Sequence, residues 1–146
     1  MLSNSCKYAI RAVIYIALHS DDSHKLGSKF VAENLNMPQP FLAKILQELT
    51  KRHIISSSKG PKGGFYLTED NLENSVLDIV NAIDGLDKFN QCFLGLHTCS
   101  SEKPCSVHNI VEPFKESIAL KLSNNTIAQF AEEIRTGKSF ISLEEI

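Results

Sequence analysis

Apolar residues recur at intervals of three and four along most of the chain, which predicts a mainly helical protein. The first helix is expected over residues 5–19, with an apolar face formed by Ala9, Ile10, Val13, Ile14, Ile16, Ala17 and Leu18. A short second helix is expected over residues 29–36, with Ser28 as its cap. Its inward face is expected to hold Phe30, Val31 and Leu35.

A third helix is expected from about Gln39 to Arg52. Asn36 before it tolerates the left-handed conformation of a tight turn, and prolines 38 and 40 suit the first turn of a helix. Its buried face is expected to consist of Phe41, Leu42, Ile45, Leu46 and Leu49. Two short helices joined by a turn of three or four residues predict a helix-turn-helix.

Two short strands are expected next, over residues 54–58 and 64–68. The segment KGPKGG between them has the glycine and proline content of a hairpin tip. A helix-turn-helix followed by a basic hairpin is typical of the winged-helix fold, in which the second helix reads base edges and the wing contacts phosphates. The alternative is a small helical domain with an incidental hairpin.

Three more helices are expected after the hairpin. One follows Ser75 as its cap and ends at Gly85, and the last has a capping box of Thr126 and Gln129. Between them runs an apolar stripe that predicts pairing of a long helix with its own copy in a homodimer: Val107, Ile110, Val111, Phe114, Ile118 and Leu122. Pro113 requires that this helix either begin nearby or bend there.

The length and composition indicate either one ordinary globular domain or one small domain with an appended helical arm. The chain has 146 residues, of which 42% are hydrophobic and 22% charged. No apolar run approaches the ~20 residues of a membrane span, and Arg11 interrupts the first apolar stretch, so we expect neither a membrane partner nor a signal peptide. These features predict the reducing cytoplasm, where clustered cysteines are ligands or redox thiols.

The charge is unevenly distributed. The whole chain has a net charge of −2, but residues 28–64 hold six basic and two acidic residues, a net charge of +4. A basic patch on an otherwise acidic protein favours a polyanionic partner for one face, whereas a simple solvated surface is the alternative.

A loop over residues 91–108 holds the most distinctive chemistry. Cys92, Cys99, Cys105 and His108 follow the spacing C-x₆-C-x₅-C-x₂-H. Thiolates and imidazole are ligands for iron–sulfur clusters and zinc. Zinc sites usually show closer C-x₂₋₄-C pairs, which are absent here. A loop thiol can also be oxidised directly. Structural zinc, a thiol switch and a loop without a ligand remain the alternatives to a cluster. His108 could instead cap or pack the following helix.

The segments YAIRAVIYIA, FLAKILQEL, SSSKGPKGGFYLT and IVNAIDG, followed by the cysteine loop and a long helix, resemble bacterial winged-helix regulators of the IscR/NsrR/CymR type. The resemblance covers roughly Leu2 to Arg135. It implies a homodimeric transcriptional regulator, not an enzyme, whose iron–sulfur cluster controls DNA binding. It also implies a [2Fe–2S] cluster on Cys92, Cys99, Cys105 and His108.

The family also supplies alternatives. Nitric-oxide-sensing relatives take their fourth ligand from the first helix of the partner, where this chain has Lys7, which cannot be a ligand, beside Cys6. A packed thiol explains Cys6 without a ligand role. Some relatives carry no cluster and are controlled by a protein partner. No phosphate-binding glycine loop or catalytic triad pattern argues for an enzyme.

The expected DNA-binding surface follows from the winged-helix pattern. Gln39 and Lys44 are the candidates for base edges, and Lys51 and Arg52 for phosphate or solvent. Lys59, Gly60 and Lys62 form the expected wing tip, and Ser28 and Pro40 complete the surface. Since Pro40 and Ala43 stand where relatives place polar contacts, the sequence preference cannot be copied from them.

The expected fold is therefore mainly α with a small β-wing. We divide the chain into a winged-helix DNA-binding domain (1–86), a cysteine-rich cluster loop (87–108), and a dimerisation helix with a short final helix (109–146). The expected dimer binds palindromic promoter DNA with half-sites about one helical turn, ~34 Å, apart. The alternative is a cluster-free winged-helix regulator controlled by thiol oxidation, zinc or a protein partner.

Overall fold

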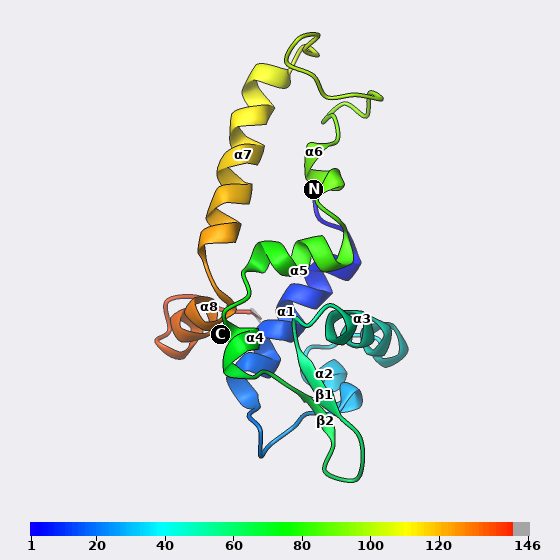
Figure 1. Ribbon diagram of the computed structural model, residues 1–146, viewed down its shortest axis with the longest axis vertical. Helices are drawn as coiled ribbons and strands as arrows, with labels where there is room; N and C mark the ends of the chain where they lie inside the picture. The colour runs from blue at the N-terminus through cyan, green and yellow to red at the C-terminus, as the bar shows by residue number, and fades with distance from the viewer. Residues whose placement is uncertain (142–146) are drawn as a thin grey trace.

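The computed structural model describes residues 1–141, so the end of the expected 109–146 segment lies outside the described residues. Within these residues the chain forms eight helices and one hairpin, and one long helix among the eight projects from a winged-helix body (Figure 1). The elements are α1 (Asn4–His19), α2 (Ser28–Asn34), α3 (Gln39–Lys51), β1 (Ser56–Ser58), β2 (Gly64–Tyr66), α4 (Glu69–Leu72), α5 (Val76–Ile83), α6 (Asp87–Asn90), α7 (His108–Asn124) and α8 (Ile127–Arg135). The short helices α4 and α6 were not predicted.

Helix α1 runs through the centre of the body, and its apolar face supplies much of the core. Ser3 caps it by accepting a hydrogen bond from the backbone N–H of Cys6. Its Val13 and Ile16 are fully buried together with Leu42, Leu46 and Leu49 of α3. The predicted apolar faces of α1 and of the second half of α3 are confirmed. Both helices have enough turns to keep one side against the core.

The helix-turn-helix is formed by α2 and α3, and Asn36 in the turn has the expected positive φ of 51°. Three details of the prediction are wrong. Ser28 is the first helical residue, and Gly27 occupies the cap position without a side-chain bond. Phe30 and Phe41 are 49% and 40% exposed, because Ala32 takes the inward place on α2 and Phe41 meets Tyr8 edge-on at the surface.

The wing is an antiparallel pair in which Ser57 lies opposite Phe65. Leu26 adds a bridge to its outer side through two hydrogen bonds with Phe65, at N···O distances of 2.9 and 2.7 Å. Gly64 permits this close approach, since a Cβ there would lie 2.7 Å from the carbonyl oxygen of Leu26. The residue also has a φ of 149°, which side-chain-bearing residues rarely adopt.

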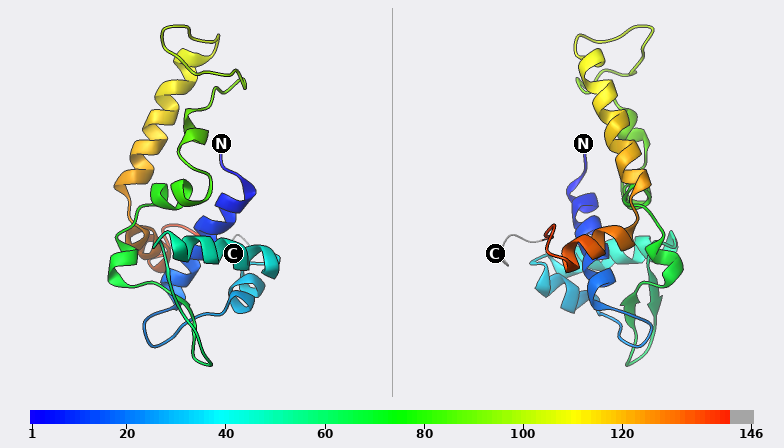
Figure 2. Two further views of the ribbon diagram at one scale, coloured as in Figure 1. Left: turned by 45° about the vertical axis from the view of Figure 1, so that its right-hand side comes forward. Right: turned by 90° about the vertical axis from the view of Figure 1, so that its left-hand side faces the viewer.

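Helix α7 begins at the cysteine loop, at the opposite end of the molecule from the wing, and runs back to the body (Figures 1 and 2). Its C-terminal half packs against α5 through Ile118 and Leu122, which contact the cluster of Cys6, Val80 and Phe89. Pro113 lies inside this helix, which begins at His108. Of the two predicted explanations for Pro113, a nearby helix start or a bend, the structure therefore supports the nearby start.

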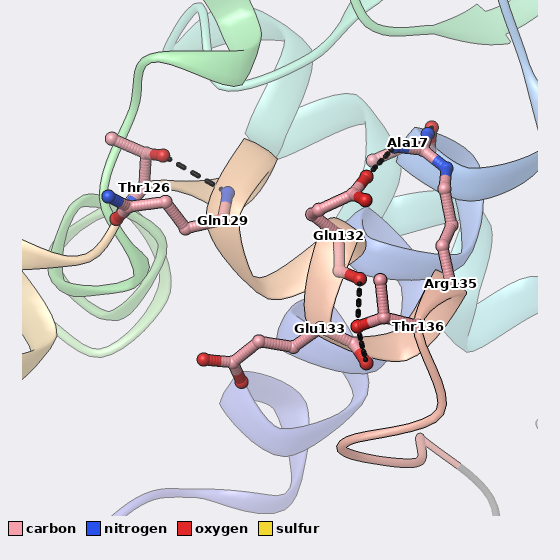
Figure 3. Close-up of polar contacts among 7 residues, drawn as sticks. All are labelled: Ala17, Thr126, Gln129, Glu132, Glu133, Arg135 and Thr136. Carbon is pink, nitrogen blue, oxygen red and sulfur yellow. Dashed lines mark hydrogen bonds and ion pairs between the residues drawn. The ribbon is translucent and has the colours of Figure 1, made fainter.

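Helix α8 returns the chain to α1. Its predicted capping box is present, with Thr126 accepting from the N–H of Gln129 (Figure 3). Arg135 donates to the carbonyl of Ala17 in α1 at 3.4 Å. A bridge between Ser75 and Thr126 also holds the starts of α5 and α8 side by side. The base of α7 is thereby fixed on the body.

A buried carboxylate joins the start of α1 to the end of α5. The side chain of Asp84 is 3% exposed and lies 3.6 Å from the ammonium of Lys88. It accepts hydrogen bonds from the backbone N–H of Ser3 at 2.9 Å and from the Ser3 hydroxyl. Burial alone would raise the pKa of Asp84, but the Ser3 donors and Lys88 outweigh it and hold this pKa below its ordinary value.

We expect Asp84→Asn to lower the free energy of unfolding at neutral pH by about 1–3 kcal/mol, because charge-assisted hydrogen bonds are lost. A carboxyl with a depressed folded-state pKa stabilises the protein above its unfolded-state pKa, and this contribution disappears as the pH falls through the folded-state value. Urea unfolding between about pH 7 and pH 3 should therefore show the two proteins converging in acid. Asp87→Asn, at an exposed position, is the control, and a constant difference at every pH would contradict the assignment.

Candidate functional site

The outer face of α3 carries the residues expected to read DNA. Gln39, Pro40 and Lys44 are exposed on it. The amide nitrogen of Gln39 donates to the hydroxyl of Ser28 at 3.3 Å, so the starts of α2 and α3 present one polar surface. Arg52 forms an exposed ion pair with Glu48 at 3.1 Å, and Lys51 beside it is exposed. Because such surface pairs are weak, Arg52 can exchange this partner for a phosphate.

The wing places three further candidates together at its tip. Lys59, Gly60 and Lys62 are all exposed there, and Gly60 has a φ of 102° in the turn. The sequence reasoning missed Lys25, whose ammonium lies 4.8 Å from the ring centre of Tyr66 on β2. This cation–π contact adds another positive charge beside the hairpin.

Asn71 in α4 connects the reading helix to the wing. Its amide nitrogen donates to the carbonyl of His53 at 3.1 Å, just after α3, where His53 has a positive φ of 59°. Its amide oxygen accepts from the hydroxyl of Ser56 on β1 at 2.7 Å and from the N–H of Thr68 at 3.0 Å. Asn71 is 7% exposed, so these bonds are shielded from water. It joins the end of α3 to the start of the wing, the two elements expected to contact DNA, and no sequence pattern had singled it out.

The cysteine loop gathers its donors at the start of α7. The Cys99 sulfur lies 3.4 Å from Nδ1 of His108, and the Cys92 sulfur lies 3.9 Å from the Cys105 sulfur. His108 is the first residue of α7 and is 8% exposed. The cysteines are all free thiols. Four residues separated by up to sixteen positions thus form two close donor pairs.

The pKa values of Cys92 and Cys99, one thiol from each pair, are shifted in opposite directions. Backbone N–H groups, first that of Leu96 and then that of Leu94, lower the pKa of Cys92 by stabilising its thiolate. Burial raises the pKa of Cys99, and the adjacent Glu112 carboxylate raises it further. The loop therefore favours the thiolate at Cys92 over the thiolate at Cys99.

Two charged residues of α7 belong to the same site, although the sequence reasoning missed them. Glu112 lies 3.6 Å from the Cys99 sulfur through Oε2. Lys115 is 9% exposed, donates to the carbonyl of Gln91 at 2.6 Å, and lies 3.7 Å from Glu112. The available indication was their spacing of four and seven residues after His108, which places all three on one helix face.

Cys6 lies apart from this donor group in an apolar environment. It is fully buried with Val80 and Phe89. Burial, with a smaller effect of the Asp84 charge, raises its pKa to about 12. Cys6 is therefore a packed thiol within its own protomer.

The expected dimerisation stripe divides into two parts. Ile110 and Phe114 are 76% and 58% exposed, whereas Ile118 and Leu122 pack partly against their own chain. Val111 is half-buried. A groove of about 540 Å³ runs beside the exposed part and is lined by apolar residues including Phe89, Phe93, Ile110 and Phe114. The N-terminal half of α7 thus presents an apolar face.

The helix-turn-helix, the hairpin and the exposed cations define a winged-helix DNA-binding protein. A family model described as Rrf2, iron-dependent transcriptional regulator, matches residues 2–133, and the chain belongs to this family. Its members are transcriptional regulators, not enzymes, and DNA binding follows from the family. Among the described residues no helix is long and apolar enough to span a membrane.

Several relatives agree with this assignment. A protein of Aquifex aeolicus (strain VF5), whose name describes an HTH-type transcriptional regulator, is 33% identical over 147 residues, covering 99% of this chain and 94% of its own. The HTH-type transcriptional regulator IscR of Yersinia pseudotuberculosis serotype O:1b (strain IP 31758) is 27% identical over 128 residues, covering 88% and 77%.

Two solved structures share the fold. T. potens IscR has a TM-score of 0.72 at 20% identity and covers 100% of this chain and 96% of its own. CymR, the global cysteine regulator of B. subtilis, has a TM-score of 0.70 at 16% identity and covers 90% and 96%. They confirm the mainly helical winged-helix architecture.

We expect Asn71→Ala to weaken binding to an operator selected from random duplexes, because the angle between α3 and the wing is no longer fixed. The free energy of unfolding should fall by about 1–3 kcal/mol, since buried partners lose their hydrogen bonds. Fluorescence anisotropy and urea unfolding measure the two effects. Asn81→Ala, at an exposed position of α5, is the control. Unchanged operator affinity of the folded Asn71 variant would contradict its positioning role.

Proposed function

We propose that the chain is a homodimeric regulator whose affinity for palindromic promoter DNA depends on an iron–sulfur cluster, of the [2Fe–2S] type, held by Cys92, Cys99, Cys105 and His108. The observation that carries this proposal is that these four donors form two close pairs, of which the Cys99–His108 pair lies at the start of α7. We place this regulator in the cytoplasm, where promoter DNA is found.

The spacing of the donors supports a metal centre. A tetrahedral ion with bonds of about 2.0–2.3 Å keeps two neighbouring ligand atoms roughly 3.3–3.8 Å apart. The Cys99–His108 pair at 3.4 Å and the Cys92–Cys105 pair at 3.9 Å are close to this separation. Two such pairs match the two irons of a [2Fe–2S] cluster, and imidazole can replace thiolate on one of them. When bound, the cluster would supply a redox- and iron-sensitive link between the start of the loop at Cys92 and its end at His108.

The fold supplies a route from the loop to DNA. Lys115 ties Gln91, at the start of the loop, to α7. Helix α7 packs on α5, and α5 packs on α3, which bears Gln39 and Lys44. A change in the loop can therefore shift α7 and, through α5, the orientation of the reading helix. In the dimer it would also alter the spacing of two such helices.

The exposed apolar face of α7 supports the homodimer. Ile110 and Phe114 gain by burial against a second copy, and the adjacent groove offers room for side chains of that copy. We propose that Ile110, Val111, Phe114, Ile118 and Leu122 form this interface, with the last two also buttressed by α5 of their own chain.

A thiol switch is the second candidate, favoured by the 3.9 Å approach of the Cys92 and Cys105 sulfurs. A peroxide would oxidise the Cys92 thiolate to a sulfenic acid, and attack by Cys105 would then form the disulfide and release water. Control by a protein partner, as in some cluster-free relatives, stays a prediction.

Anaerobic purification should yield a coloured protein with equal amounts of iron and acid-labile sulfide. Serine at Cys92, Cys99 or Cys105 should abolish the cluster absorption, because each removes a thiolate ligand. His108→Ala should weaken or alter it. Cys6→Ala is the matched control and should retain iron. A colourless, iron-free wild type would contradict the cluster, and peroxide-dependent Cys92–Cys105 disulfide formation would then favour the thiol switch.

Lys62→Ala should reduce the slope of log K against log salt by about one for each protomer, because one phosphate contact is lost at the wing. Duplex binding measured across a salt series gives this slope. Lys121→Ala, exposed on α7, is the control of equal charge change. An unaltered slope for Lys62→Ala would exclude the wing-tip phosphate contact.

A further inference from the structure

Three side chains of different kinds converge at the start of α7. They are the thiol of Cys99, the imidazole of His108 and the carboxylate of Glu112, and their donor atoms lie within 4.8 Å of one another. Cys92 and Cys105 are not members of this group. The group therefore differs from the four donors proposed for the cluster.

The distances suit a single ion. The Cys99 sulfur lies 3.4 Å from Nδ1 of His108 and 3.6 Å from Oε2 of Glu112. Tetrahedral zinc, with Zn–S of about 2.3 Å and Zn–N or Zn–O of about 2.0–2.1 Å, would hold such ligand pairs about 3.5–3.6 Å apart. The donor atoms of His108 and Glu112 lie within 4.8 Å of each other, and closing around an ion brings these two atoms nearer.

Helix α7 fixes two of the three donor residues relative to each other. His108 and Glu112 are four residues apart in α7, so their side chains project from the same face one turn apart. His108 is buried, while Cys99 and Glu112 are half-buried, which leaves an entry path. The alternative role for Glu112 is only that of ion-pair partner to Lys115, 3.7 Å away.

We propose that, in the cluster-free protein, Cys99, His108 and Glu112 bind one divalent first-row metal ion such as Zn²⁺ or Fe²⁺, with Glu112 as a ligand that the cluster does not use. Binding replaces the Cys99 thiol proton, which passes to solvent, and leaves a fourth position for water. This inference deepens the proposed function, on which it rests, since Cys99 and His108 serve both centres. The ion and the cluster therefore exclude each other, and metal supply would compete with cluster assembly.

Cobalt(II) provides a visible probe of this site. Full-length protein freed of metal by a chelator should bind one Co²⁺ per chain, with sulfur-to-cobalt charge transfer and the intense visible bands of a tetrahedral ion. Glu112→Gln should weaken Co²⁺ binding about tenfold or more, since loss of even an outer-shell partner costs 10–100-fold. Glu116→Gln, exposed one turn further along α7, is the matched control and should bind as the wild type does.

The doubly substituted Cys92→Ser, Cys105→Ser protein separates the two centres. It should lose the iron–sulfur cluster but keep the Co²⁺ site with its charge-transfer band. Equal Co²⁺ affinity in the wild type and Glu112→Gln, or loss of Co²⁺ from the double variant, would overturn the inference. X-ray absorption of the wild-type cobalt protein should show one sulfur ligand, and two or three would overturn it without any variant. A wild type that binds Co²⁺ in this way but never assembles a cluster would instead contradict the proposed function alone.

Discussion

Two apolar clusters meet on α5, and this contact joins the DNA-reading body to the projecting helix. Ile79 is buried in the main core with the inner faces of α1 and α3, while its neighbour Val80 lies in the smaller cluster with Cys6 and Phe89. Ile118 and Leu122 of α7 pack onto that smaller cluster. Close-packed interiors transmit displacements instead of absorbing them, so a shift of α7 must be accommodated at α5. This packing supports the proposed coupling between α7 and α3.

Much of the fold could be predicted from the sequence, because helical periodicity and capping chemistry are local. The apolar face of α1, the Ser75 cap of α5 and the capping box of α8 followed from local sequence alone. The errors fall where tertiary contacts decide. Phe30 is exposed because Ala32 takes the buried place on α2, and Phe41 is exposed because it meets Tyr8 edge-on at the surface. The single-turn helices α4 and α6 have too few residues to show a period.

Only part of the candidate site could be predicted from the sequence. Thiols and an imidazole at suggestive spacing singled out the loop, since few residue types share their chemistry. Glu112, Lys115 and Asn71 escaped notice because carboxylates, ammonium groups and amides are common on helix surfaces. Their roles depend on which groups the fold places opposite them, such as the Cys99 sulfur for Glu112 and the His53 carbonyl for Asn71. The sequence alone does not show which groups the fold places opposite these side chains.

The most direct test of the account compares operator affinity of the cluster-loaded and cluster-free protein from one anaerobic preparation. The two forms should be measured at the same salt concentration, because phosphate contacts dominate absolute affinity. If the loop acts through α7 and α5 on the reading helices, the affinities should differ by about 5- to 150-fold, the usual range of coupling between distant sites. Equal affinities for the same operator would contradict the central claim that the cysteine loop controls DNA binding.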